Sequence, residues 1–314
     1  MRLWRRFMIA LARSEAVTDF IQERAPVSKL ARRFVGGEDQ GLATATAQRL
    51  DADGIRSSLF YLGEYVDDPM MVRMNTDAIV AMVEALGQSA LDVHVSVDPT
   101  QIGYSLGAGL GRENAERIGA ALAAQPARPR NALMLDMEDF SMVETTIALH
   151  NALVEADVPT AITLQAYLRR TEDDLTRLAG AGATVRLVKG AFAEKTARAF
   201  TGRRRITKNY LRLAGIMLGG DARAAGFTPV FGTHDDAVIR VVAALARDNG
   251  WPDGSFEFEM LYGVRPALLK SLAEAGHAVR VYLPFGRDWW PYAARRIGED
   301  FANARFVARA LLGR

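Results

Sequence analysis

The most informative chemistry in this sequence lies near its C-terminus, in the stretch YLPFGRDWWPYAARRIGE at 282–299. A helix that begins near Trp289 would place Arg295 four residues and Arg296 three residues before Glu299. At these spacings one carboxylate pairs with both guanidinium groups, and two arginines held in this way form a rigid clamp for a carboxylate or a phosphate. The ordinary alternative is an exposed helix with surface ion pairs. The apolar WWPY entry argues against it, because it would hold the helix on the rest of the protein.

A second group of polar residues lies at the C-terminal ends of the short apolar runs along the chain. Its members are Asp98, Asp136, Glu138, Gln165, Arg186, Lys189, Thr233, His234, Glu259 and Tyr282. Each residue alone has an ordinary explanation, since a carboxylate at a strand end often caps the next helix. Their number favours a shared site. Strand alternation puts Arg186 and Val188 on one face and Leu187 and Lys189 on the other, so only one of the two cations is expected to point inward.

The composition excludes several other classes of chemistry. The chain has 314 residues, 49% hydrophobic and 24% charged, with a net charge of +2, which is too small to indicate a nucleic-acid binder. The basic run GRRRI at 202–206 is interpreted as a solvated loop or helix face. The absence of cysteine excludes thiol catalysis, and four histidines leave little material for a metal site, so no metal is expected. The motif GAGLGR at 107–112 carries arginine where a dinucleotide fingerprint needs glycine, and is interpreted as a loop before a helix.

The N-terminal stretch MRLWRRFMIALARS is basic and apolar but lacks the long apolar core of a signal peptide. Trp4, Phe7, Met8 and Leu11 would share one helical face. We favour a packing helix, with a peripheral membrane contact as the alternative. No apolar run approaches the ~20 residues of a membrane span.

Strands alternating with helices must position these residues. The expected strands are SLFYLG near 58, LDVHVSV from 91, NALMLDM from 131, PTAITLQ from 159, ATVRLVKG from 183, TPVFGT from 228, SFEFEML from 255 and AVRVYLP from 278. Helical patterns between them begin near 75, 112, 142, 171, 235 and 265. Eight such units predict an α/β fold, a (β/α)₈ barrel over 51–314, whose reactive residues lie at the C-terminal ends of the strands. Residues 1–50 are expected to form an N-terminal helical arm.

Taken together, the motifs resemble the proline dehydrogenase family, flavoenzymes of proline catabolism. The matching motifs cover nearly the whole predicted barrel in the family's order: YLGE at 61–64, LDMED at 135–139, LQAYLRR at 164–170, VRLVKGAF at 185–192, GTHD at 232–235, EMLYGVRP at 259–266 and VYLPFGRDWWPYAARRIGE at 281–299.

The resemblance implies a distorted TIM-like barrel with FAD across the strand ends and the final helix above the flavin. By similarity, Asp136 and Arg186 are the expected catalytic residues. The residues expected to bind FAD are Met137, Gln165, Arg186, Val188, Lys189, Gly190, Ala191, Thr233 and His234, the last two at its adenosine-diphosphate part. The residues expected to bind substrate are Asp98, Leu187, Tyr282, Arg295, Arg296 and Glu299, with the arginines on the carboxylate and Leu187 and Tyr282 against the ring.

The activity implied is oxidation of L-proline to Δ1-pyrroline-5-carboxylate by hydride transfer to flavin N5, with a quinone as acceptor. The expected location is cytoplasmic, with a possible peripheral position at the inner face of the membrane. No nucleic-acid partner is expected.

The sequence departs from the family pattern at three positions. Asp98 stands where a lysine is usual, Phe192 where a tyrosine is common, and Glu259 where a glutamine is common. An anion at 98 should weaken the binding of a carboxylate. Two alternatives therefore stay open: a divergent member that oxidises another cyclic secondary amine or amino acid, and a barrel that has lost catalysis.

Overall fold

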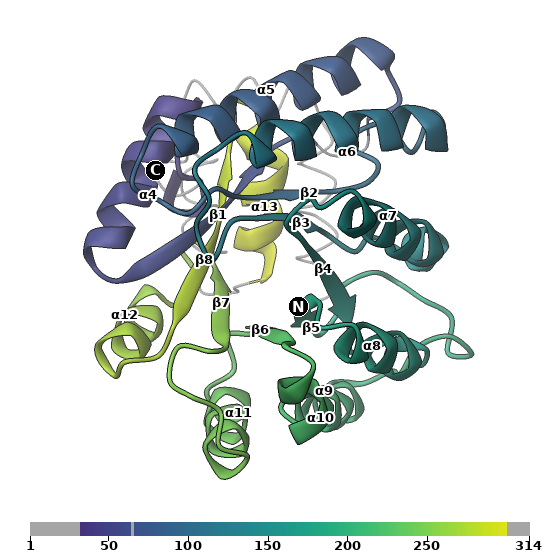
Figure 1. The fold of residues 1–314 in the computed structure, drawn as a ribbon, viewed down its shortest axis with the longest axis vertical. Coiled ribbons are helices and arrows are strands. Elements are labelled where there is room, and N and C mark those ends of the chain that lie inside the picture. The colour runs from purple at the N-terminus through teal and green to yellow at the C-terminus, as the bar shows by residue number, and fades with distance from the viewer. Residues whose placement is uncertain (1–31, 64–65, 300–314) are drawn as a thin grey trace, which may run out of the picture.

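The computed structural model describes residues 32–63 and 66–299, with the backbone alone at positions 32, 294, 295 and 297–299. Eight parallel strands pair in chain order and close into a barrel, because β8 pairs with β1 (Figure 1). The strands are β1 (Ile55–Tyr61), β2 (His94–Val97), β3 (Ala132–Leu135), β4 (Thr160–Gln165), β5 (Thr184–Val188), β6 (Thr228–Gly232), β7 (Glu257–Leu261) and β8 (Val279–Phe285). Each strand lies where the sequence predicts one, and the predicted fold class is confirmed.

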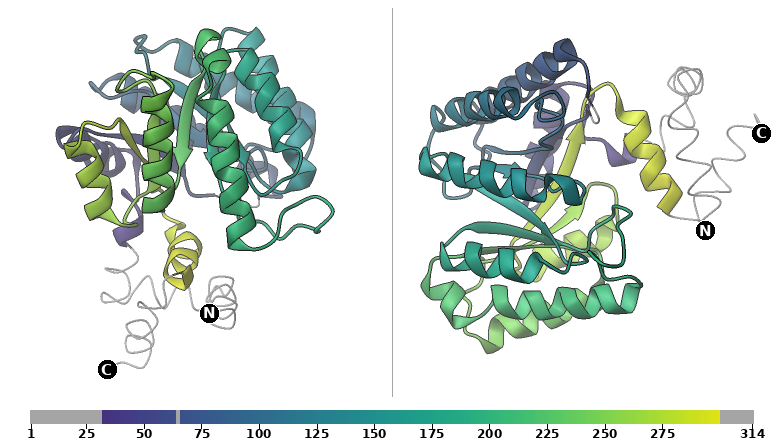
Figure 2. Two further views of the ribbon diagram at one scale, coloured as in Figure 1. Left: turned by 90° about the horizontal axis from the view of Figure 1, so that it is seen from below. Right: turned by 90° about the vertical axis from the view of Figure 1, so that its right-hand side faces the viewer.

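Helices surround the barrel. They are α4 (Gln40–Ala52), α5 (Pro69–Gly87), α6 (Ala108–Ala123), α7 (Val143–Glu155), α8 (Thr171–Gly180), α9 (Arg203–Met217), α10 (Gly220–Ala224), α11 (Asp236–Asp248), α12 (Pro266–Glu274) and α13 (Trp289–Glu299), with short 3₁₀ turns η1 (Arg32–Phe34) and η2 (Phe140–Met142). Several begin at an Asp whose carboxylate accepts backbone N–H bonds, as Asp68 does for α5 and Asp235 for α11. Because α13 follows β8 after three residues, it lies at the C-terminal end of the barrel, as Figure 2 shows from the side.

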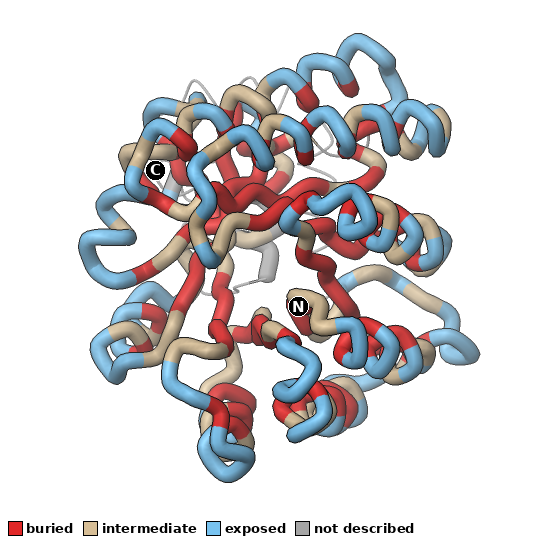
Figure 3. The backbone as a smooth tube through the Cα atoms, in the orientation of Figure 1, coloured by how far each residue is buried: buried red, intermediate tan, exposed pale blue. Residues whose placement is uncertain are grey.

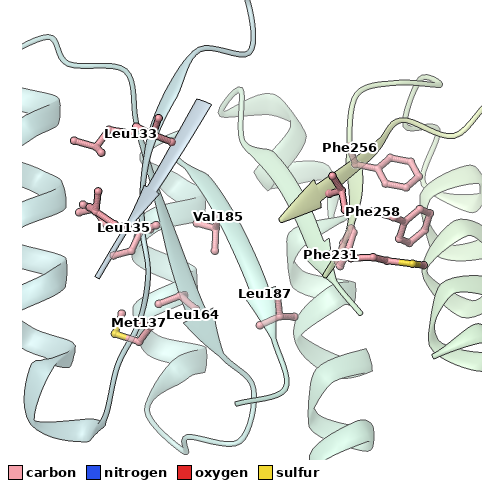
Figure 4. Close-up of a cluster of buried hydrophobic side chains, with 14 of the residues drawn as sticks. Leu133, Leu135, Met137, Leu164, Val185, Leu187, Phe231, Phe256 and Phe258 are labelled. Atoms are coloured by element: carbon pink, nitrogen blue, oxygen red, sulfur yellow. The ribbon is translucent and has the colours of Figure 1, made fainter. Parts of the chain in front are cut away.

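The main hydrophobic core fills the layer between the strands and the helices. Figure 3 shows this layer as buried backbone inside an exposed outer surface. Figure 4 shows part of it, where Leu135, Leu187 and Phe231 come from three different strands. Ala132, Met134 and Ala161, on the alternate positions of β3 and β4, form a separate small apolar cluster. Polar side chains share the lumen with it.

Three details differ from the sequence analysis or extend it. Helix α6 begins at Ala108, so GAGLGR lies mainly in its first turn rather than in a loop. Helices α9 and α10 were not among the predicted segments, and the arginines of GRRRI open α9 with exposed side chains.

Most residues of the predicted N-terminal arm lie outside the described ranges, including Trp4, Phe7, Met8 and Leu11. Helix α4 crosses the predicted boundary at residue 50 and contacts β1 and β8. None of the helices in the described ranges is both long and apolar enough to cross a bilayer.

Candidate functional site

An ion-pair cluster with buried Arg280 and Glu257 at its centre lies at the N-terminal ends of the strands and closes the lumen there. Arg280 on β8 donates to Glu257 on β7 at 2.8 Å and to Asp92 at 3.3 Å, and Arg56 donates to Glu257 at 2.9 Å. Despite its burial, the pKa of Glu257 falls to about 2, because the positive charges of Arg280, Arg130 and Arg56 favour its ionised form. This cluster forms the floor of the site.

The side chain of Arg186 lies in the part of the lumen near the C-terminal ends of the strands and contacts residues on or directly after three other strands. Its Nε donates to Thr163 Oγ1 at 3.0 Å, its Nη1 donates to Glu259 Oε1 at 2.6 Å, and its Nη2 donates to Asp136 Oδ1. The partners come from β4, β7 and the end of β3, so Arg186 points into the barrel. All four side chains are buried. The guanidinium is therefore held in one orientation.

Tyr282 on β8 completes this group. Its hydroxyl donates to Asp136 Oδ2 at 2.8 Å, and the guanidinium carbon of Arg186 lies 5.3 Å from the centre of its ring. The ring also stacks on Phe60. Asp136 is thus fixed between Arg186 and Tyr282, and the structure brings three of the predicted site residues into direct contact.

Gln165 lies at the upper end of β4 beside this group. Its amide nitrogen donates to the backbone oxygens of Met137 and Glu138, at 3.1 Å each. Its Oε1 is buried and accepts no hydrogen bond from any residue in the described part of the chain. A buried acceptor of this kind is available to a donor on a bound ligand or to an ordered water.

A cleft of about 700 Å³ opens on the rim of the barrel, beyond β5 and β6. It is lined by Lys189, Arg203, Gly232, Thr233, His234, Asp235, Asp236, Ala237, Arg240 and Arg265. Lys189 pairs with Asp235 at 2.9 Å, and Arg265 pairs with Asp236 at 2.8 Å. Four cations against two carboxylates make the cleft suitable for an anionic group such as a diphosphate.

His234 is a neutral member of this rim. Burial, followed by the charges of Arg296, Arg265 and Lys189, lowers its pKa to about 4. Its Nε2 accepts from the N–H of Leu261 at 2.9 Å, which leaves the ring proton on Nδ1. Thr233 is buried, and its hydroxyl accepts from the N–H of Asp235 at 3.2 Å.

The backbone after β5 turns sharply at the predicted cofactor-binding stretch. Gly190 has φ +93°, and a side chain at this position would collide with the ring of Tyr167. Only glycine adopts this conformation here without strain. Val188 is half-buried and packs beside Gly232, whereas Ala191 is exposed.

Three further predicted residues lie apart from the lumen or at its edge. Leu187 is fully buried in the hydrophobic core between the barrel and the helices (Figure 4). Since it follows Arg186 directly on β5, its side chain lies on the opposite face of the strand. Contrary to expectation, it offers no surface to a substrate at Arg186, because successive side chains of a strand alternate. Met137 also packs in this core. Asp98 is half-buried directly after β2, at the rim.

Helix α13 begins at Trp289, as the sequence predicts, and is anchored by the buried rings of Trp289, Trp290 and Tyr292. The guanidinium carbon of Arg296 lies 5.4 Å from the centre of the Tyr292 ring, and its charge acts on His234. Arg296 is therefore near the rim. The side chains of Arg295 and Glu299 lie outside the described residues, so their pairing stays a prediction.

Thr163 and the arginines that line the cleft were not among the residues predicted from the sequence. Alternation within TAITLQ places Thr163 on the same face as Gln165, which would have identified it. Arg203 belongs to the run that was interpreted as a solvated face, and it is indeed exposed, yet it also lines the cleft.

A closed parallel barrel with buried, ion-paired residues at the C-terminal ends of its strands is the architecture of a (β/α)₈-barrel enzyme. Residues 43–309 match the sequence profile of the family described as Proline dehydrogenase. The chain is 34% identical over 316 residues to the proline dehydrogenase of Deinococcus radiodurans, covering 99% of this chain and 98% of the relative. It is 32% identical over 309 residues to proline dehydrogenase 1 of Bacillus subtilis strain 168, covering 98% and 99%. The chain belongs to the proline dehydrogenase family, and it is an oxidoreductase.

Solved structures agree on the fold. Proline utilization A from Bdellovibrio bacteriovorus superposes with a TM-score of 0.77 at 21% identity, over 86% of this chain and 32% of that one. The protein of the same name from Corynebacterium freiburgense gives a TM-score of 0.76 at 21% identity, over 99% and 35%. This chain thus spans about a third of the length of these proteins.

Proposed function

We propose that this protein oxidises L-proline to Δ1-pyrroline-5-carboxylate with FAD as its cofactor and a quinone as the acceptor of the electrons. The observation that carries the proposal is the fixed Arg186 guanidinium at the strand ends of a chain that matches the proline dehydrogenase family over 43–309.

The residues of the site fit FAD. Gln165 Oε1 and Glu259 Oε2 are buried acceptors that no described residue serves, as expected where a ring with N–H groups is bound. The cationic rim cleft suits the diphosphate, with Thr233, His234 and Lys189 as its ligands. Gly190 allows close approach of the backbone after β5. When bound, FAD accepts a hydride at N5 from the carbon next to the substrate nitrogen.

The protein's own residues bind the substrate and orient it toward the cofactor. Arg186 places a positive charge in a buried site, where it favours the negative charge that develops during hydride transfer. Asp136 and Tyr282 hold the Arg186 side chain in place. Arg296, with Arg295, binds the substrate carboxylate, and the buried tryptophans of α13 anchor the helix that carries both arginines.

The test is turnover. Protein loaded with FAD is incubated with L-proline and a soluble quinone, and the product is sought by mass spectrometry at two hydrogens below proline. D-proline is the matched control, since the arginines would hold its carboxylate with the wrong hydrogen toward the flavin. Formation of product from neither enantiomer would contradict the proposal.

A second candidate is oxidation of a cyclic amino acid that carries an additional cation. It is favoured by Asp98, whose half-buried position at the rim after β2 adds an anion to the strand ends. Asp98→Lys separates the two candidates. The variant should lower the KM for L-proline under the first, and leave it unchanged under the second.

A further inference from the structure

Arg186 is shared between two carboxylates, although one would neutralise it. Asp136 and Glu259 bind different nitrogens of the same guanidinium. The three side chains together carry a formal charge of −1 and are at most 8% exposed. Asp136 and Thr163 already hold Arg186 in its orientation, so the second carboxylate is open to a further role.

The two carboxylates differ in their remaining contacts. Both oxygens of Asp136 are used, one by Arg186 and Thr163 and the other by Tyr282. Glu259 uses Oε1 for Arg186, while its Oε2 is buried and receives no hydrogen bond from the described residues. Glu259 contributes mainly its charge.

The next cation, Arg280, also interacts electrostatically with Glu259, but it makes no direct ion pair with it. Arg280 lies next to Glu259 in the register of β7 and β8 and pairs directly with Glu257 and Asp92, whereas the direct partner of Glu259 is Arg186 at 2.6 Å. In a buried site, charges interact far more strongly than in water. The charge of Glu259 consequently acts on Arg186 and on the group bound in the site next to Arg186.

We propose that Glu259 is a positioning residue that lowers the reduction potential of the bound flavin by offsetting the positive charge of Arg186. This inference rests on the proposed function, in which Arg186 faces the cofactor. The flavin takes up two electrons and one proton as a hydride from the substrate and gains negative charge. Because Glu259 offsets part of the guanidinium charge, that gain is stabilised less, so the electrons pass more readily to the acceptor.

The experiment compares midpoint potentials of flavin-loaded wild type and Glu259→Gln, measured by equilibration with a reference dye. Glutamine keeps the size of the side chain and an acceptor for Arg186 but removes the charge. The expected result is a shift of at least tenfold in the equilibrium constant toward the reduced form, about 30 mV more positive for a two-electron couple. Glu259→Met serves in its place if the Gln variant does not retain flavin.

Two controls separate charge from shape. Glu259→Asp keeps the charge, and its potential should stay close to that of wild type. Glu257→Gln makes the same neutralisation on the same strand, at the floor of the lumen, and should shift the potential much less than Glu259→Gln.

The outcomes distinguish the two proposals. An unchanged or more negative potential in flavin-loaded Glu259→Gln would overturn this inference and leave the proposed function standing, as would an equal positive shift in Glu259→Asp. Failure of the wild type to bind FAD would overturn both.

Discussion

Removal of Arg186 should strongly destabilise the protein even without cofactor. In Arg186→Met, the carboxylates of Asp136 and Glu259 would remain buried without their cation. At about 4 Å and an effective dielectric constant of about 20, each contact is worth about 4 kcal/mol before desolvation is subtracted. Breaking a buried ion pair from one side costs about 3–5 kcal/mol net. We therefore expect a loss of about that size in the free energy of unfolding.

The assay is thermal unfolding of the flavin-free protein. A loss of this size lowers the Tm by roughly 6–10 °C, at about 2 °C per kcal/mol for a chain of this length. Arg212→Met is the matched control, because its partner Glu172 is exposed and such surface pairs contribute about 0–1 kcal/mol.

A double variant tests the stated cause. Arg186→Met with Glu259→Gln leaves only one of the two carboxylates that paired with the guanidinium, so it should be more stable than Arg186→Met alone, with a coupling energy of at least about 1 kcal/mol. A loss below about 1 kcal/mol in Arg186→Met, or simple additivity in the double variant, would refute the reasoning.

Three further predictions concern the rim. Arg296→Met should raise the KM for L-proline at least about tenfold, while the FAD content stays constant. The control is Arg247→Met at an exposed position on α11, which should change neither quantity. A loss of flavin as large as the loss of substrate binding would show that Arg296 holds the cofactor instead. The pKa of His234 is about 4 in the folded protein and about 6.5 in the unfolded chain. Between pH 6.5 and pH 4, therefore, the His234 ring takes up a proton in the unfolded state but not in the folded state. Stability should thus fall by up to about 3 kcal/mol as the pH drops from 6.5 to 4, and His234→Gln should flatten that slope in urea titrations. Gly190→Ala should weaken FAD binding, measured by flavin fluorescence, because φ +93° and the ring of Tyr167 exclude a side chain; unaltered affinity would argue against a close approach there.

The barrel itself was predictable from local patterns. Apolar, β-branched runs bounded by polar residues identify the strands, because the strands of a parallel barrel are buried on both faces. Alternation also predicted that only one of Arg186 and Lys189 points inward, and Arg186 does so while Lys189 pairs with Asp235 at the rim. The same alternation argues against Leu187 as a substrate contact once Arg186 is placed in the lumen.

The partners of Arg186 could not be predicted in this way. Asp136, Thr163 and Glu259 come from three strands and lie 50, 23 and 73 residues away along the chain. Their contact depends on strand register and barrel closure, which no local pattern encodes. The cleft arginines escaped notice for a related reason, since an exposed helix face and the wall of a cleft carry the same residue types.

The visible absorption spectrum of FAD-loaded protein, recorded without oxygen before and after addition of L-proline, tests the central claim most directly. We expect the flavin band to bleach on addition of L-proline and to persist on addition of D-proline. A flavin band that stays unchanged at saturating L-proline would contradict it.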